Sequence, residues 1–193
     1  MARKKNFDEG EVLEKALQLF WKKGYNATSI QDLVDELGIN RASIYDTWGD
    51  KHQLYVAALQ RYRQNSSSWL LNQIRSDKPA SEIIEAFLNH VIEDVMQDHD
   101  KKGCFVVNST TELANLDPDI QMLVSENKQT IERVLAELVK EGQESGEFNT
   151  KQSAQAYARF IFNNINGLRV VCKTFASREE LQEVVDITIR SLK

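Results

Sequence analysis

The sequence predicts an all-α protein of about nine helices, and three observations support this fold class. Apolar residues recur at steps of three and four along most of the 193-residue chain, which is the period of a helix. The alternating pattern that is typical of strands is scarce. Residues that cap helices, among them serine, threonine, aspartate and glycine, stand at the ends of the periodic segments.

Four helices are expected in the first 75 residues. We place them before Gly24, between Thr28 and Gly38, between Asn40 and Gly49, and over residues 50–75. Thr28 and Gln31 have the spacing of a capping box, in which the threonine hydroxyl accepts a hydrogen bond from a backbone amide of the first turn. Gly38 can adopt the left-handed conformation that ends the second helix. The second and third helices are therefore short and joined by a tight turn.

Five further helices are expected in the rest of the chain, at about 79–97, at 103–114, from 118 to an end bracketed by Gly142 and Gly146, at 150–175 and at 178–192. Pro79 suits a first helical turn, and Ser177 with Glu180 forms another capping-box pattern. The sequence has no internal repeat. We divide it into a first domain of residues 1–50 and a second of residues 51–193, and the helix at 50–75 connects the two.

The composition is that of an ordinary globular protein, with 41% hydrophobic and 27% charged residues. No apolar run approaches the roughly 18 residues that span a bilayer, so we expect no membrane partner. The N-terminus turns acidic where a secretory signal would be apolar, which favours the cytoplasm. The net charge of −5 divides into +1 over residues 1–64 and −6 over the remainder. A less acidic N-terminal part fits a local DNA-binding face.

No pattern of catalytic or metal-ligating residues stands out. Neither the two cysteines, Cys104 and Cys172, nor the three histidines have the spacing of a metal site. We find no nucleophile elbow and no phosphate-binding loop. We therefore expect no enzymatic activity, no metal and no cofactor. In a cytosolic chain both cysteines should be reduced.

Residues 28–48 form a helix-turn-helix pattern, in which two short helices meet at Gly38-Ile39-Asn40. The major groove of B-DNA admits one α-helix, and small and polar side chains let that helix approach the base edges. We expect the groove-facing residues of the third helix to be Arg41, Ala42, Ser43, Asp46 and Thr47, and we expect Arg41 to read a guanine. We expect phosphate contacts from Thr28, Tyr45, Lys51 and His52.

Two features near this pattern leave alternatives open. Asp46 is repelled by phosphates, so we expect it either to accept from a cytosine amino group or to orient Arg41. Arg3, Lys4 and Lys5 are either a solvated tail or an arm that reaches the DNA and contributes to salt-dependent binding.

Nine residues between Val12 and Leu59 stand in the order and at the spacing of the TetR family of bacterial regulators, which this stretch resembles. They are Phe20, Gly24, Thr28, Ile30, Ile39, Ser43, Tyr45, Lys51 and Leu54. The Gly103-Cys104-Phe105 and Asn108 pattern, together with Gly167-Leu168, is similar to one broad subgroup. Where many relatives have His-Phe, this chain has Thr47-Trp48.

The resemblance implies a two-fold dimer that binds a near-palindromic operator and is released by a small molecule, with repression as the usual outcome. Half-sites would lie one helical turn, or a multiple, apart. The effector pocket is expected at Trp69, Phe87, His90, Met96, Phe105, Asn108, Met122, Phe162 and Asn166. Two apolar stripes predict a dimer interface at Phe160, Leu168, Val171, Leu181, Val184, Val185 and Thr188.

Three alternatives remain at this point. Cys104 is either a small buried apolar residue or a thiol that senses oxidants or electrophiles, in which case nearby Lys101 and Lys102 would favour the thiolate. His90 is either a core histidine or a polar group of the pocket. The chain as a whole is alternatively a helical interaction protein that does not bind DNA.

Overall fold

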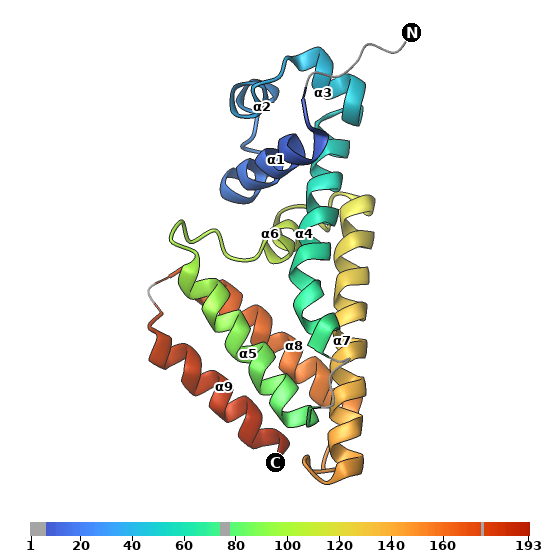
Figure 1. The fold of residues 1–193 in the computed structure, drawn as a ribbon, viewed down its shortest axis with the longest axis vertical. Coiled ribbons are helices and arrows are strands. Elements are labelled where there is room, and N and C mark those ends of the chain that lie inside the picture. Colours follow the sequence, from blue (N-terminus) through green and yellow to red (C-terminus); the bar gives the residue numbers. More distant parts are fainter. Residues whose placement is uncertain (1–6, 74–77, 175) are drawn as a thin grey trace.

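A computed structural model shows an all-α fold, which confirms the predicted fold class (Figure 1). The structure describes residues 7–73, 78–174 and 176–193, and within them it contains helices and no strands. The helices are α1 (Glu9–Lys23), α2 (Ile30–Leu37), α3 (Arg41–Trp48), α4 (Lys51–Gln73), α5 (Ala80–Gln97), α6 (Phe105–Leu113), α7 (Pro118–Ser145), α8 (Ala154–Val171) and α9 (Arg178–Leu192). None of these helices is both long enough and apolar enough to cross a membrane.

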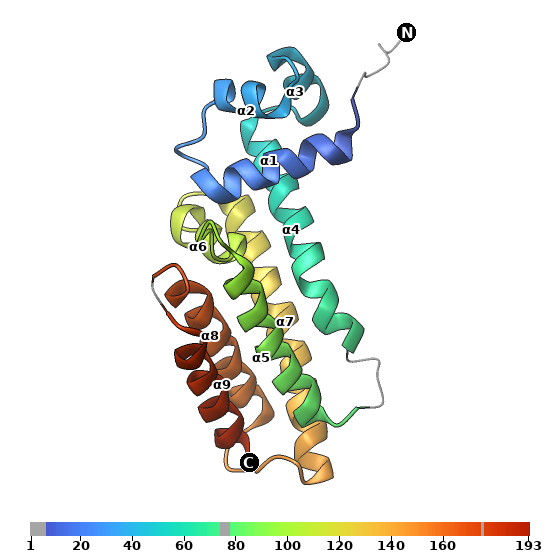
Figure 2. The same ribbon diagram turned by 60° about the vertical axis from the view of Figure 1, so that its left-hand side comes forward.

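The helices form a small unit at one end and a longer body below it. α1, α2 and α3 gather at the upper end of the molecule, and α4 leads from them into the body beside α7 (Figures 1 and 2). α5, α8 and α9 complete the body, where α7 packs on α8 and α5 packs on α9. α6 is a short helix under α1, at the level where the two parts meet (Figure 2). The third helix therefore lies at the end farthest from the C-terminus.

Two apolar cores hold this arrangement together. One is formed by α1 to α4, α6 and the first turns of α7, with Phe20, Leu33 and Ile44 fully buried in it. The other lies among the end of α4, α5, the later turns of α7, α8 and α9. The first core thus extends past residue 50, because α6 and α7 cover the lower side of α1 and α4. The division at residue 50 stays a prediction about function.

Most of the predicted helix ends are confirmed. Ser177 and Glu180 form the expected capping box at α9, and Asp50 accepts a hydrogen bond from the Gln53 amide at 2.7 Å. α8 is shorter than predicted, because Ser153 caps it at one end and it stops at Val171. Pro79 precedes α5 as its N-cap residue. The expected end of α4 near residue 75 lies outside the described residues.

Gly142 lies inside α7 and is needed for packing. A Cβ atom built at this position would lie 2.2 Å from Cδ2 of Phe148, whose ring is buried in the second core. The helix continues past Gly142 and ends at Gly146, which adopts the left-handed conformation. Of the two glycines that were expected to bracket the end of this helix, only Gly146 terminates it. Gly142 instead admits the Phe148 ring.

We expect Gly142→Ala to destabilise the protein by about 1–3 kcal/mol, because overpacking forces the Phe148 ring or α7 to move. In an unhindered helix the same change would stabilise the protein by up to about 1 kcal/mol. The sign of the change in the free energy of unfolding therefore tells whether the Phe148 ring is packed tightly against Gly142. Thermal or urea unfolding measures it. Gln129→Ala, an exposed position on the same helix, is the control. A variant as stable as the parent would show that the contact is not tight.

Candidate nucleic-acid interface

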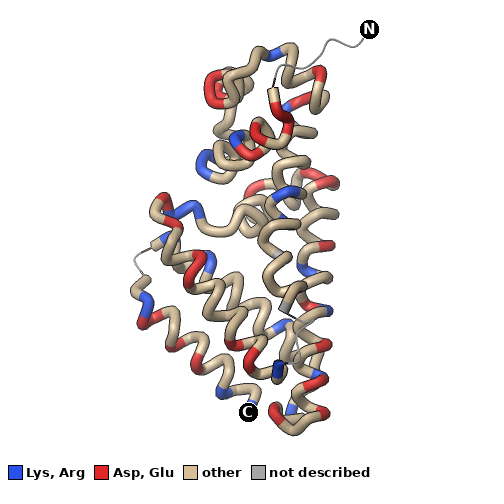
Figure 3. Tube along the Cα trace, viewed as in Figure 1, with Lys and Arg blue, Asp and Glu red and all other residues tan. Residues whose placement is uncertain are grey.

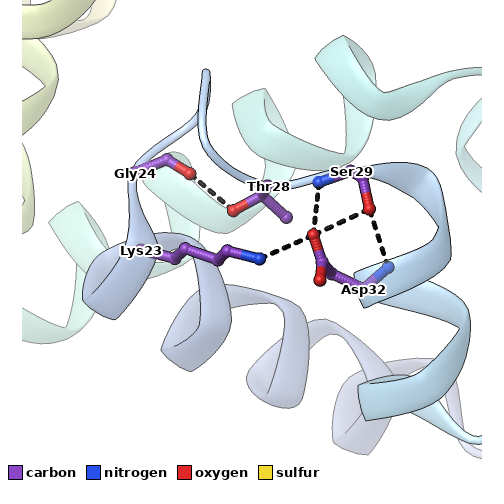
Figure 4. Close-up of polar contacts among 5 residues, drawn as sticks. All are labelled: Lys23, Gly24, Thr28, Ser29 and Asp32. Carbon is purple, nitrogen blue, oxygen red and sulfur yellow. Dashed lines mark hydrogen bonds and ion pairs between the residues drawn. The ribbon is translucent and has the colours of Figure 1, made fainter.

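A small polar network fixes α2 against α1 (Figure 4). The Ser29 hydroxyl accepts from the backbone amide of Asp32 at 3.0 Å, and the Asp32 carboxylate accepts from the Ser29 amide at 2.7 Å. Lys23 Nζ lies 2.7 Å from the same carboxylate. The hydrogen bond from Lys23 and those from Ser29 hold the pKa of Asp32 well below its usual range. The start of α2 is thus tied to the end of α1.

The predicted capping box at Thr28 and Gln31 is wrong by one residue. Ser29 is the N-cap residue of α2, and Asp32 is its partner. The Thr28 side chain is fully buried and its hydroxyl donates to the Gly24 carbonyl oxygen at 2.5 Å. A buried hydroxyl with an internal acceptor cannot reach a phosphate, so the Thr28 side chain is removed from the predicted DNA contacts.

α3 is held by its inner face. Ile44 is fully buried, and the Trp48 ring stacks on Phe7 with centroids 6.5 Å apart. The Asn40 side chain caps the helix by accepting from the Ser43 amide at 2.8 Å. Gly38 has a φ of 68°, which turns the chain sharply between α2 and α3. These contacts leave the opposite face of α3 uncovered.

That opposite face carries the predicted reading residues. Arg41, Ala42, Tyr45 and Asp46 are exposed, and Ser43 is partly exposed. The expected role of Asp46 in orienting Arg41 is not seen, since no ion pair joins them among the described residues. Thr47 departs further from expectation, because its Oγ1 is buried and has no hydrogen-bond partner among the described residues.

The charge around this face is mostly acidic. Residues 24–50 contain one basic residue, Arg41, and five acidic ones, and Figure 3 shows acidic positions on α2 and α3. Attraction to phosphates must therefore come mainly from Arg41, from cations that flank this stretch and from helix N-termini. Arg3, Lys4 and Lys5 lie outside the described residues, and their role as an arm stays a prediction.

Lys51 and His52 begin α4 just below α3. Lys51 Nζ lies 4.2 Å from the centroid of the Tyr25 ring, and burial lowers the pKa of this lysine. His52 Nε2 lies 2.6 Å from Asp117 Oδ2. The imidazole therefore faces α7 in this structure, and the phosphate contact of His52 stays a prediction.

His52, Asp117 and Asp119 form a group of three possible metal ligands, whose ligand atoms all lie within 4.8 Å of one another. However, both oxygens of Asp117 already have partners. Oδ1 caps α7 by accepting hydrogen bonds from backbone amides of its first turn, and Oδ2 pairs with His52. The cluster is explained by these contacts.

Helices α1 to α3 form the reading unit, and two of the contacts that join it to the body involve backbone groups of the connecting segments. The Glu112 carboxylate of α6 accepts from the backbone amides of Tyr25 at 3.1 Å and Asn26 at 2.8 Å. The Trp21 indole donates to the carbonyl oxygen of Gly103 at 2.9 Å. The first contact connects the turn after α1 to α6, and the second connects α1 to the segment before α6. A displacement of that segment would therefore act directly on the helix-turn-helix.

A cleft of about 640 Å³ lies beside the second contact, between α1, α4, α5 and the segment that connects α5 to α6. Its wall includes Trp21, Tyr62, His90, Cys104 and Arg169. Burial, followed by the adjacent Cys104 thiol, raises the pKa of the Tyr62 phenol well above its usual value. This cleft is the candidate site for a small ligand, since it combines aromatic surfaces with a few polar groups.

Of the nine residues predicted for the effector pocket, only His90 lies on this wall. Its ring stacks on Trp69, with centroids 4.7 Å apart, and its Nε2 lies 3.7 Å from Asp94. The remaining eight lie elsewhere. Asn108 lines a smaller cleft under α1, Phe87 and Phe105 are buried in the cores, Met96 and Met122 are exposed, and Trp69, Phe162 and Asn166 are partly buried.

The cleft was missed because its wall comes largely from charged and aromatic side chains of separate elements. Trp21 and Tyr62 belong to α1 and α4, which the prediction treated as reading unit and connector. One signal was present in the sequence. Arg169 follows Ile165 by four residues, and a charged residue in that inward-facing stripe indicates a polar environment inside the fold.

The predicted dimer stripes divide into two faces. Leu168, Leu181, Val185 and Thr188 are buried within the protomer. Phe160, Val171 and Val184 are exposed, and so is Ile187, which the prediction omitted. Both helices are apolar on two sides, and apolar periodicity alone does not tell an inner stripe from an outer one. The exposed residues line the outer side of α8 and α9.

Comparison with known proteins agrees with this geometry. A family model described as "Bacterial regulatory proteins, tetR family" matches residues 12–58, and one described as "Tetracyclin repressor-like, C-terminal domain" matches residues 80–188. YezE of Bacillus subtilis (strain 168), an uncharacterized HTH-type transcriptional regulator, is 28% identical over all of both chains. The HTH-type transcriptional repressor ComR of Escherichia coli (strain K12) is 29% identical over 97% of this chain and 90% of its own length.

Solved structures of the same kind superimpose on the whole chain. A cysteine mutant of the TetR family transcriptional regulator CifR, solved with 26-bp double-strand operator DNA, matches with a TM-score of 0.84 and 25% identity over 98% of this chain and 99% of its own. The reduced form of E. coli NemR matches with a TM-score of 0.80 over 95% and 97% of the two chains. At 18% identity, this second likeness concerns the fold alone.

We expect Arg41→Ala to relax the base preference at one position of the bound sequence. Loss of a guanine contact should weaken binding to the preferred sequence by about 1–3 kcal/mol. Gel-shift titrations on DNA duplexes that differ at single base pairs measure this effect. Arg133→Ala, which removes an exposed arginine of α7, is the control. An equal loss on every duplex would show that Arg41 contacts a phosphate instead.

Proposed function

Because the chain belongs to the TetR family of DNA-binding transcriptional regulators, we propose that it is a ligand-responsive repressor. In this proposal it binds a near-palindromic operator as a homodimer and is released by a small molecule. Family membership sets aside an enzyme and a helical interaction protein that does not bind DNA. The functional division at residue 50, with an effector-binding and dimerising part after it, belongs to the same proposal.

DNA binding by this chain is supported by the uncovered face of α3. Arg41, Ser43 and Asp46 are the candidates for base contacts, with Ala42 allowing close approach to the groove. Tyr45 and Lys51 are the candidates for phosphate contacts. One such helix in each protomer of a two-fold dimer predicts two half-sites separated by about one helical turn or a multiple of it.

A homodimer is supported by the exposed apolar side chains of α8 and α9. Phe160 and Val171 on α8, and Val184 and Ile187 on α9, lie on the side that faces away from the core. A Cβ atom built at Gly167, between the two α8 residues, meets nothing within 4 Å. Such a face on a two-helix layer fits packing against its own symmetry copy, because a two-fold interface is self-complementary.

The single observation that carries the ligand response is the position of the cleft. Its wall includes both Trp21 of α1 and Gly103 of the connecting segment, which are joined by a hydrogen bond of 2.9 Å. A ligand that separates these two groups would also displace α6, and with it the Glu112 carboxylate that holds the Tyr25 and Asn26 amides. The ligand and the DNA would then favour different arrangements of the reading unit.

Repression is supported by the relatives. ComR and BdcR of E. coli and DhaR of Mycobacterium sp. (strain GP1) are repressors, whereas FasR of Mycolicibacterium smegmatis is an activator. Selection of bound sequences from random DNA, repeated with candidate small molecules, tests the proposal. We expect a near-palindromic sequence that is lost when the effector is added. Tight binding that no small molecule relieves would contradict the ligand response.

A second candidate for regulation is thiol sensing at Cys104. The residue is buried, but it lies on the cleft wall beside Tyr62, so an oxidant or electrophile has a route to it through the cleft. Cys104 and Cys172 are both free thiols. Among the similar solved proteins, CifR was solved as a cysteine mutant and NemR in its reduced form. The position of Cys104 on the cleft wall favours it over Cys172 as the sensor.

If Cys104 is the sensor, Cys104→Ser should abolish release from DNA by an oxidant, because serine forms neither a sulfenic acid nor a disulfide. Release measured by gel shift, with and without peroxide, decides the matter. Cys172→Ser, which changes the other free thiol, is the control. Full release from the Cys104→Ser variant would end this candidate and leave the small-molecule response as the remaining one.

The dimer surface makes a separate prediction. Ile187→Glu would bury a carboxylate in an apolar interface, which should weaken the dimer by roughly 3 kcal/mol. Light scattering should show a shift towards monomer, and operator binding should weaken with it. Gln182→Glu adds the same charge to another side of α9 and serves as the control. An Ile187→Glu protein that stays dimeric, or a parent protein that is monomeric, would contradict this surface.

A further inference from the structure

Arg169 is a charged residue on the inner side of α8. It follows the buried Ile165 by four residues and is itself largely covered, yet it belongs to the wall of the cleft. The segment before α6 lies close to it, because a Cβ atom built at Gly103 would be 3.2 Å from the Arg169 carbonyl oxygen. Its guanidinium makes no hydrogen bond or ion pair with any described residue. It is therefore a cation whose donors are free to meet a ligand.

Each of the four acidic side chains around the cleft has a polar partner other than Arg169. Glu14 pairs with Arg61 at 2.9 Å and Asp100 with Lys22 at 3.6 Å. Asp98 Oδ2 accepts from the Gly103 backbone amide at 2.6 Å, while its Oδ1 is buried without a hydrogen-bond partner among the described residues. Asp94, which interacts electrostatically with Arg169, lies 3.7 Å from His90. None of the four lies within ion-pair distance of Arg169. Taking an arginine out of water without a direct ion pair is costly, so an anion that enters the cleft and pairs with Arg169 is favoured.

Lys102 is a second cation at this wall without a carboxylate partner among the described residues. Its Nζ lies 3.1 Å from the Gln18 side-chain oxygen and 4.2 Å from the centroid of the Trp21 ring. The Trp21 and Tyr62 rings, whose centroids are 5.0 Å apart, supply apolar surface between this lysine and Arg169 in the same wall. The wall thus offers positive groups together with an aromatic surface.

We propose that this cleft binds an organic monocarboxylate, with its carboxylate on Arg169 and its apolar body against Trp21 and Tyr62. A guanidinium matches the planar geometry of a carboxylate and binds it through two parallel hydrogen bonds. The four neighbouring acidic side chains make a doubly charged group such as a phosphate monoester unfavourable, because each adds repulsion to a second negative charge. The inference deepens the proposed function, since the carboxylate would be the effector that acts on the Trp21–Gly103 contact.

Binding is tested by isothermal titration of the full-length protein, without DNA, with three probes that share a naphthyl ring. These are 2-naphthoate, its uncharged amide 2-naphthamide, and 2-naphthyl phosphate. We expect 2-naphthoate to bind about tenfold or more tightly than either of the others, which corresponds to about 1.4 kcal/mol. Arg169→Gln should remove this preference, and Arg169→Lys should retain part of it. Arg159→Gln, which changes an exposed arginine of the same helix, should leave binding unchanged.

Several outcomes would overturn the inference. Equal binding of the acid and the amide, tighter binding of the phosphate, full affinity in Arg169→Gln, or no binding of 2-naphthoate at millimolar concentration would each do so. The comparison of probes on the parent protein decides even if Arg169→Gln does not fold. A gel shift with each probe keeps the two proposals apart. Release by neutral molecules that does not depend on Arg169 would preserve the ligand response and refute the carboxylate site.

Discussion

The arrangement of this molecule depends on one carboxylate. Glu112 of α6 accepts hydrogen bonds from two successive backbone amides, Tyr25 and Asn26, just after α1 ends. The approach is possible because Gly24 has a φ of 84° and no side chain, and a Cβ atom there would lie 3.1 Å from Glu112 Oε2. Charge-assisted hydrogen bonds of this kind are stronger than neutral ones. The turn that leads into the helix-turn-helix is therefore held by the body, and what moves α6 also moves the reading helix.

The same joint explains why the first core extends past the reading unit. α6 and the first turns of α7 contribute Phe105, Leu113 and Ile120 to the core that contains α1 to α4. Beside this shared core lies the cleft, and its wall is built from both parts of the molecule. A site made at such a junction can report on the relative position of the two parts, which a pocket wholly inside the body would do less directly.

The structure places two residues, Thr28 and His52, differently from the expectation drawn from the local sequence. Thr28 and Ser29 both suit an N-cap, and only the fold decides that Ser29 takes it while Thr28 turns under the helix. His52 has the polarity of a phosphate contact, but Asp117, distant in sequence, draws it towards α7. Contacts between elements that are distant in sequence cannot be predicted from the local periodicity of apolar residues. The exposed face of α3 depends only on local capping and on burial of Ile44. Its predicted residues other than Thr47 are exposed or partly exposed.

The sequence by itself determined the helical class, most of the caps and the helix-turn-helix, because these follow from spacing within a few residues of the chain. It also predicted that α8 and α9 have apolar faces, but not which of these faces points into the core. Only the tertiary structure decided which of those faces is buried, and that Trp21, Tyr62, Cys104 and Arg169 line one cleft. The reason is that the packing of helices distant in sequence determines which side of each helix is buried. The role of a charged residue such as Arg169 likewise depends on which groups surround it in the fold.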